Sequence, residues 1–150
     1  MRKEHSIIRF LFIGILLTGL PLIAQCSPTF FNSPPQTLVV CENAAPTDIS
    51  SLLTIIDGSV GTTVTWDVSL APTNGTLAGF PVSDLTNGFI LTPASGLTYT
   101  PTTGFSGTDS FRISVSYGTD MDSTTVIVTV SPPPTVDPIT GPTSVCIGGT

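Results

Sequence analysis

The sequence is poor in basic side chains. Only four of its 150 residues are lysine or arginine, and three of these, Arg2, Lys3 and Arg9, lie within the first nine positions. The only histidine, His5, lies there as well, and the rest of the chain sets one basic residue, Arg112, against nine acidic ones. Because nucleic-acid binding requires a basic surface that displaces counterions, this composition excludes it. An anionic membrane surface is a poor partner for the same reason.

Residues that perform catalysis are equally scarce. Beyond residue 9 the chain has no lysine for a Schiff base and no histidine for a Ser-His-Asp relay. It also has no cluster of cysteine and histidine that would bind zinc. A pair of carboxylates could hydrolyse glycosides, but none of the nine acids stands in the apolar context that the general acid requires. We therefore expect these 150 residues to be non-catalytic, and a catalytic domain elsewhere in a longer chain is left open.

The only long apolar run is "FLFIGILLTGLPLIA", residues 10–24. It follows a basic start and ends in a small residue, which predicts a secretory signal peptide over residues 1–24. A membrane anchor is the alternative, but the run is shorter than the ~20 residues that a spanning helix needs. Pro21 also interrupts its end. The sequence thus predicts a secreted or cell-surface protein with no transmembrane span in the mature chain.

Export would permit disulfides among the three cysteines, Cys26, Cys41 and Cys146. A bond between Cys26 and Cys41 would close a short loop and contribute ~3 kcal/mol in the chain-entropy description. Cys146 lies beyond a proline-rich stretch and is expected to belong to a different module. A lipid anchor on Cys26 is disfavoured because Gln25, and not a small residue, precedes it. The sequence leaves the pairing of the cysteines open.

Most of the chain shows the pattern of short strands joined by tight turns. Glycine and proline contribute 14 residues each, between segments rich in valine, threonine and serine. In "TTVTWDVSL" four apolar residues alternate with polar ones, so they share one face of a strand: Val64, Trp66, Val68 and Leu70. Residues 111–117 and 124–130 alternate in the same way on either side of "YGTDMDS", and they predict a hairpin.

About seven such strands within roughly 95 residues predict an all-β fold, an antiparallel sandwich of two sheets. We assign residues 25–36 to a lead-in linker and residues 37–131 to the sandwich domain. Residues 132–138 read as a stiff proline-rich linker, and residues 139–150 as the start of a second, truncated module. The expected core consists of Leu52, Val64, Trp66, Val68, Phe105, Phe111, Ile113, Val115, Val126 and Val128.

The segment "YTPTTGFSGTDSFRISVSYG", followed by "STTVIVTV", resembles the last strands of bacterial Ig-like, cadherin-like modules. Such modules are repeated in tandem in large secreted or cell-surface proteins, as in the Bacteroidetes group. "APTNGTLAGFP" is similar to their mid-domain turn, and "ITGPTSVCIGGT" to the first strand of a further repeat. The resemblance implies a structural or adhesion module whose partners include neighbouring repeats of the same chain. Because a fold alone assigns no ligand, a protein or glycan ligand stays unidentified. A carbohydrate-binding accessory domain of a secreted hydrolase is the alternative function.

Asp120 and Asp122 are one residue apart in the predicted turn "YGTDMDS". Calcium takes several oxygen ligands, often from carboxylates in loops, and the resemblance adds that some cadherin-like modules bind calcium between repeats. The two aspartates are therefore candidate calcium ligands, with Asp57 or Glu42 as further ligands if the fold brings them near. The alternative is that they only shape the turn. No other cofactor is expected.

Three further positions have a functional and a structural interpretation. Asp109 could be a ligand or a catalytic acid, but we favour a carboxylate that accepts backbone N–H groups and fixes the corner before Phe111. Trp66, the only tryptophan, could bind a sugar, but its register with its apolar neighbours favours the core. Tyr99 and Tyr117 have the same two interpretations.

Overall fold

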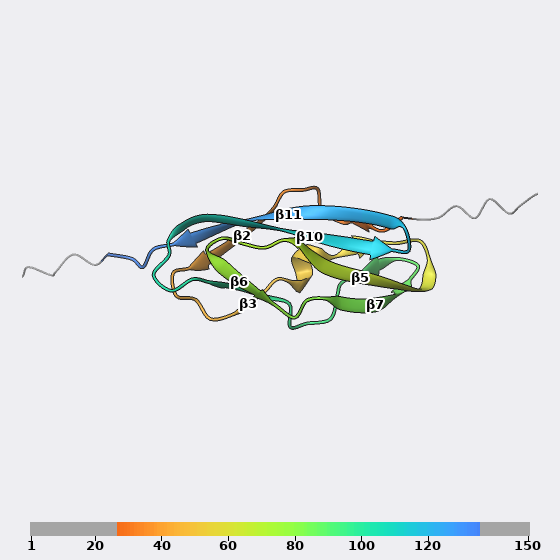
Figure 1. Ribbon diagram of the computed structural model, residues 1–150, viewed down its shortest axis with the longest axis horizontal. Helices are drawn as coiled ribbons and strands as arrows, with labels where there is room; N and C mark the ends of the chain where they lie inside the picture. Colours follow the sequence, from red (N-terminus) through yellow and green to blue (C-terminus); the bar gives the residue numbers. More distant parts are fainter. Residues whose placement is uncertain (1–26, 136–150) are drawn as a thin grey trace, which may run out of the picture.

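The computed structural model describes residues 27–135 (Figure 1). The signal peptide and the second module predicted above therefore concern residues outside the described range. Apart from one 3-10 turn, η1 (Ser50–Leu53), the secondary structure of these residues is all β. The strands are β1 (Thr29–Phe30), β2 (Gln36–Cys41), β3 (Thr47–Asp48), β4 (Ile55–Ile56), β5 (Val60–Leu70), β6 (Gly75–Ala78), β7 (Val82–Asn87), β8 (Ile90–Leu91), β9 (Thr98–Pro101), β10 (Gly107–Tyr117) and β11 (Asp120–Ser131).

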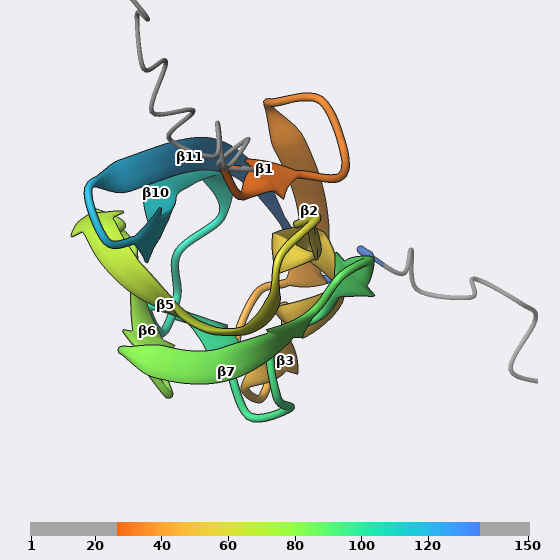
Figure 2. The ribbon, with the colours of Figure 1, turned by 90° about the vertical axis from the view of Figure 1, so that its right-hand side faces the viewer.

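The strands form the predicted sandwich, with one continuous layer and one divided layer. The continuous layer is a five-stranded sheet with the order β2-β11-β10-β5-β7. Two three-stranded sheets, β1-β4-β8 and β3-β9-β6, make up the rest. Figure 2 looks along the long axis and shows the strands surrounding a common interior. The strands number eleven and not about seven, because β1, β3, β6 and β7 lie in segments for which the sequence predicted no strand.

One strand pair departs from the predicted antiparallel arrangement. β2 and β11 run parallel, in register from Gln36↔Val126 to Cys41↔Ser131. All other pairs are antiparallel. The described chain therefore begins at one end of the long axis, which we call the N-terminal end of the sandwich, and leaves at the opposite, C-terminal end (Figure 1).

The segment predicted as a lead-in linker contributes to the fold. Within it, β1 pairs with β4, and the N–H of Phe31 donates to the carbonyl oxygen of Thr54 at 2.9 Å. Phe30 is partly buried against the core. A strand of two residues is too short to show a periodic pattern, so the sequence gives no sign of it.

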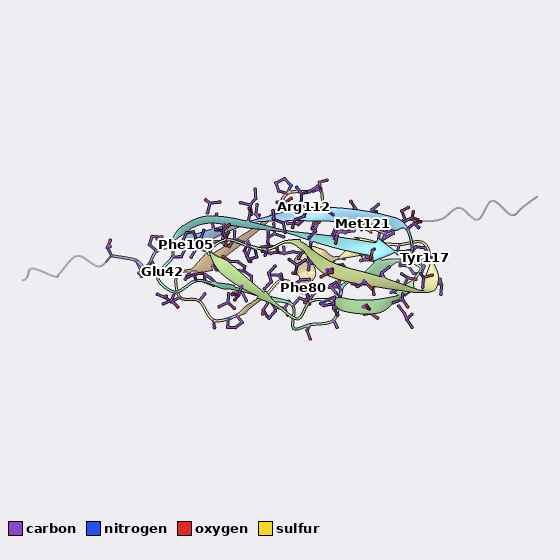
Figure 3. All side chains as sticks on the ribbon, viewed as in Figure 1. Glu42, Phe80, Phe105, Arg112, Tyr117 and Met121 are labelled. Atoms are coloured by element: carbon purple, nitrogen blue, oxygen red, sulfur yellow. The ribbon has the colours of Figure 1, made fainter. Side chains whose placement is uncertain are left out.

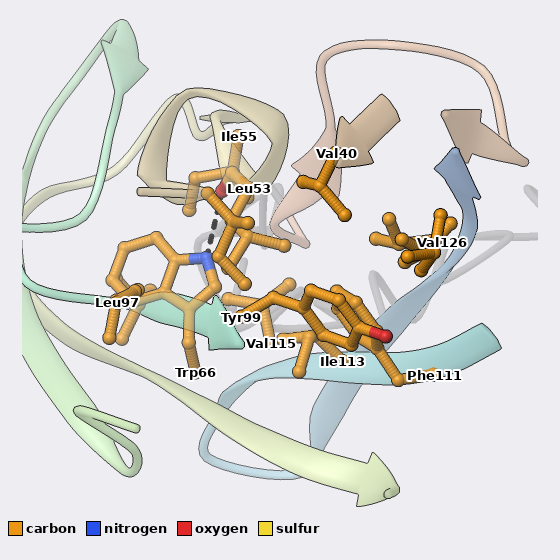
Figure 4. Packing of buried hydrophobic residues seen from close by; sticks show 14 residues of the cluster. Val40, Leu53, Ile55, Trp66, Leu97, Tyr99, Phe111, Ile113, Val115 and Val126 are labelled. Carbon is orange, nitrogen blue, oxygen red and sulfur yellow. Dashed lines mark hydrogen bonds between the residues drawn. The ribbon is translucent and has the colours of Figure 1, made fainter. Parts of the chain in front are cut away.

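The core lies in the interior of the sandwich, between the layers (Figure 4). Seven of the ten predicted core residues are fully buried, and the remaining three, Leu52, Val68 and Phe105, pack against them. The cluster also contains seven residues outside the predicted set: Val40, Ile49, Leu53, Ile55, Leu97, Tyr99 and Val130. All fourteen lie between residues 40 and 130, so residues 27–135 carry a complete core of their own.

The prediction that Leu70 shares one face of the strand with Val64, Trp66 and Val68 is wrong, because a bulge intervenes. Val68 pairs with Ile113, whereas Leu70 pairs with Arg112, so Ser69 is an extra residue in β5. A bulge of this kind shifts the alternation of the strand by one position. Leu70 is therefore on the outer side and exposed.

Candidate functional site

Residues 27–135 contain no detectable pocket. In the same range no three His, Cys, Asp or Glu side chains are grouped as the ligands of a metal ion would be. Nor does the described part of the chain include a helix long and apolar enough to cross a membrane. The functional candidates are therefore single carboxylates, aromatic side chains and surfaces.

Asp120 and Asp122 lie at the N-terminal end of the sandwich, where β11 begins its antiparallel pairing with β10. Only Gly118 and Thr119 connect the two strands, so both aspartates belong to the strand and not to the turn as predicted. They occupy the face of β11 that carries the buried Thr124 further along. Two carboxylates thus share one face at this end of the molecule.

Hydrogen bonds occupy one of these carboxylates and not the other. Asp122 accepts from the N–H of Phe30 through Oδ2 at 3.0 Å and from the N–H of Ser123 through Oδ1 at 2.7 Å. Asp122 thereby ties β1 to β11. The Oδ2 atom of Asp120 is buried, and no residue of the described range bonds to it. Asp120 is therefore the carboxylate of the pair with spare bonding capacity.

Asp57 and Glu42, the two further calcium ligands considered above, lie in different surroundings. Asp57 is buried after β4, and its Oδ1 accepts from both the N–H and the hydroxyl of Ser59, at 2.7 and 2.5 Å. Its Oδ2 is buried, again without a partner among residues 27–135. Glu42 lies at the opposite end, since its N–H donates to the carbonyl oxygen of Ser131. Ser131 follows Asp120 by eleven positions, which span about 36 Å along β11, so Glu42 cannot join the aspartates (Figure 3).

Asp109 performs the structural role predicted for it. Its Oδ1 accepts from the N–H groups of Thr73 at 3.0 Å and Ser110 at 2.9 Å, and its Oδ2 from the N–H of Asn74 and the hydroxyl of Tyr99, both at 3.0 Å. The Tyr99 ring stacks on Phe111 with 5.8 Å between ring centroids. Burial, and then the neighbouring Asp109 carboxylate, raise the pKa of the Tyr99 hydroxyl well above its ordinary value of 10.0. One carboxylate thus holds the loop before β6, strand β9 and the start of β10 together.

Trp66 belongs to the core, as its register predicts. Its side chain is fully buried, and the indole Nε1–H donates to the carbonyl oxygen of Leu53 at 3.0 Å (Figure 4). A sugar cannot stack on a ring with no exposed face, so the hypothesis of sugar binding through Trp66 is wrong. Tyr99 is buried as well, whereas Tyr117 is partly exposed at the end of β10.

Cys41 is exposed at the C-terminal end of β2, level with Ser131. Cys26 and Cys146, its possible disulfide partners, lie outside the described residues, so the pairing of the cysteines stays open.

Several solved structures resemble this chain at low identity. An endo-fucoidan hydrolase of glycoside hydrolase family 107 is 17% identical over 74% of this chain and 14% of its own, with a TM-score of 0.49. The CooA pilin subunit of enterotoxigenic Escherichia coli is 14% identical over 73% and 99% of the two chains, with a TM-score of 0.48. A C. elegans member of the MSP family is 11% identical over 65% and 94%, with a TM-score of 0.44. With TM-scores below 0.5, these likenesses carry no argument about function.

Sequence comparison is more decisive. No curated protein sequence matches the chain. The bacterial Ig domain family, however, matches residues 32–131, which is more than half of the chain. This stretch holds the strands from β2 to β11 and the whole buried core. The chain belongs to the bacterial Ig domain family.

Proposed function

We propose that this domain is a non-catalytic spacer or adhesion module of an exported, multi-domain surface protein. The chain enters at one end of the sandwich and leaves at the other, so modules joined in series would extend along one line. The predicted signal peptide (1–24), proline-rich linker (132–138) and second module (139–150) fit such an array. Membership of the bacterial Ig domain family supports the same role.

The parallel pairing of β2 with β11 is the observation that carries the proposal. Tension on the two ends of the domain pulls β2 and β11 in opposite directions along their own axes. Six residue pairs, extended by the bond from the Glu42 N–H to the Ser131 carbonyl oxygen, then resist together. If the two strands were instead separated from one end, each bond would break in turn. The domain is therefore built to remain folded while it holds its neighbours apart.

Single-molecule stretching of residues 27–135 tests this function. In the first geometry, handles at Ser27 and Thr135 load the β2–β11 pair in shear. In the second, handles at Cys41 and Thr135 peel the same pair from one end, and Cys41 is the only cysteine of the fragment. We expect a clearly higher unfolding force in the first geometry. Equal forces in the two geometries would refute the mechanical role.

A carbohydrate-binding role is the alternative, and it needs a surface other than the buried Trp66. Incubation of residues 27–135 with a glycan array distinguishes the two functions. Saturable binding to one class of glycan would favour the accessory domain of a hydrolase, and its absence would favour the spacer.

A calcium ion bound by Asp120 and Asp122 is a separate proposal about the N-terminal end. The buried, unbonded Oδ2 of Asp120 favours it, because such an oxygen gains from a cation. The involvement of Asp122 with Phe30 and Ser123 weighs against it. We expect millimolar calcium to raise the thermal midpoint of the unaltered protein and not of Asp120→Asn. An unchanged thermal midpoint in both proteins would refute calcium binding by Asp120 and Asp122.

A further inference from the structure

The exposed apolar side chains are distributed unevenly over the described residues. Seven of the nine large ones gather toward the N-terminal end of the sandwich: Phe31, Ile56, Val60, Leu85, Phe89, Ile90 and Met121. Of the other two, Val39 lies toward the C-terminal end, and Leu70 lies midway along the sandwich, paired with Arg112. Single exposed apolar residues are ordinary, but a group of them marks an interaction surface.

Five of the seven lie around the small sheet β1-β4-β8 and the adjoining start of β5. Ile56 and Ile90 are direct cross-strand partners and are 46% and 51% exposed. Phe31 directly follows β1, the strand beside Ile56, and is 50% exposed. Phe89 precedes Ile90 and is 77% exposed, and Val60, at the start of β5, is 76% exposed. We call Phe31, Ile56, Val60, Phe89 and Ile90 the N-terminal apolar patch.

The chain that precedes the structure indicates what covers this patch. The apolar run of residues 10–24 ends only four residues before Pro28, and β1 begins at Thr29. Five residues extend at most ~18 Å. Whenever the run lies in a membrane, the patch is thus held within reach of the lipid surface. This requires that the run is uncleaved, as in the alternative in which it is retained as a membrane anchor.

The charges at this end specify the kind of lipid. Asp84, Asp120 and Asp122 lie at or near the N-terminal end, while Arg112, the only basic residue between 27 and 135, lies midway along β10. An anionic surface would be repelled. A second copy docked end to end would also bring the aspartates of both copies together. We propose that the N-terminal apolar patch contacts the surface of a zwitterionic lipid bilayer.

Vesicle flotation of residues 25–150, the product expected after cleavage, tests the contact. The probes are vesicles of phosphatidylcholine alone and vesicles with phosphatidylglycerol added. We expect the unaltered chain to float with phosphatidylcholine, and less well as phosphatidylglycerol is added. The double variant Phe31→Ser, Phe89→Ser should lower the partition coefficient at least ~10-fold, because amphipathic surfaces bind lipid through their buried apolar area. The matched variant Val39→Ser, Leu70→Ser, whose two positions lie outside the patch, should float like the unaltered chain.

Thermal unfolding verifies that each variant is folded. If the double variant does not fold, the single variant Phe89→Ser, at the most exposed position of the patch, replaces it in the flotation experiment. Equal loss in the two double variants would overturn the proposal, as would absence of flotation with phosphatidylcholine. Stronger binding to phosphatidylglycerol would overturn it as well. Self-association that Phe89→Ser abolishes, without lipid binding, would show instead that a second copy covers the patch.

Discussion

Replacing Asp109 with alanine should be among the most destabilising single changes in this domain. The side chain is 5% exposed and accepts four hydrogen bonds, from three backbone N–H groups and from the Tyr99 hydroxyl. Alanine leaves the three N–H groups without this acceptor and leaves the Tyr99 hydroxyl only the carbonyl oxygen of Asn74, 3.5 Å away. Each unsatisfied buried donor costs about 1–3 kcal/mol. Because part of the corner can admit water, we expect a total loss of about 3–5 kcal/mol in the free energy of unfolding.

Urea unfolding of residues 27–135, followed by the fluorescence of the buried Trp66, measures this loss. Asp109→Asn should cost less than Asp109→Ala, because the amide keeps one acceptor oxygen. Tyr99→Phe, which removes a single donor, should cost about 1 kcal/mol and less than that when Asp109 is already alanine. Asp67→Ala is the control, since Asp67 is exposed and accepts only from the N–H of Val68. If Asp109→Ala were no more harmful than this control, the carboxylate would not hold the corner.

Two further predictions concern Tyr99. Because the folded state raises the pKa of its hydroxyl, mainly by burial, the resulting stability is complete below about pH 10 and is lost as the pH rises further. The urea midpoint should therefore fall between about pH 9 and pH 11.5 for the unaltered domain, and much less for Tyr99→Phe. If the midpoint depended equally on pH in the two proteins, the Tyr99 hydroxyl would not be the cause of the fall. Gly75→Ala should lower the thermal midpoint more than Gly104→Ala. A Cβ at Gly75 would overlap the buried Tyr99 ring, whereas one at Gly104 meets no atom within 4 Å and adds only the strain of a positive φ of 76°. Similar midpoints for the two variants would mean that the ring moves aside freely.

The parts of the fold that could be predicted are those with long, regular alternation. β5, β10 and β11 each have eleven or twelve residues, enough for the period of two to stand out, and their inward residues are the buried ones. The alternation fails as a guide at Leu70, where a bulge adds a residue. It is also silent about Ile49 and Leu53, which lie on and beside a 3-10 turn with a different period. Core positions outside long strands depend on tertiary contacts that no local pattern records.

The candidate sites also have features that the local sequence could predict and features that only the fold determines. The role of Asp109 was predictable because an aspartate near the start of a strand commonly binds nearby backbone N–H groups. Its bond to Tyr99, ten residues away, needed the fold. Asp120 and Asp122 were misplaced in a turn because "YGTDMDS" is rich in turn-forming residues, yet the ladder between β10 and β11 continues to Tyr117↔Asp120. Cross-strand pairing here overrides local turn preference.

The direction of β2 is the feature on which the proposed mechanics depend, and no inspection of the segment could reveal it. Within β2, Gln36 and Val40 are buried and Leu38 is partly buried, while the residues between them are exposed. This alternation is the same whether the strand runs up or down the sheet. An antiparallel β2 beside β11 would bury the same side chains, but the domain would then begin and end at the same side, and tension would peel the pair apart. Only the path of the whole chain, which takes β2 to the edge beside the last strand, makes the two ends opposite and places their bonds in shear.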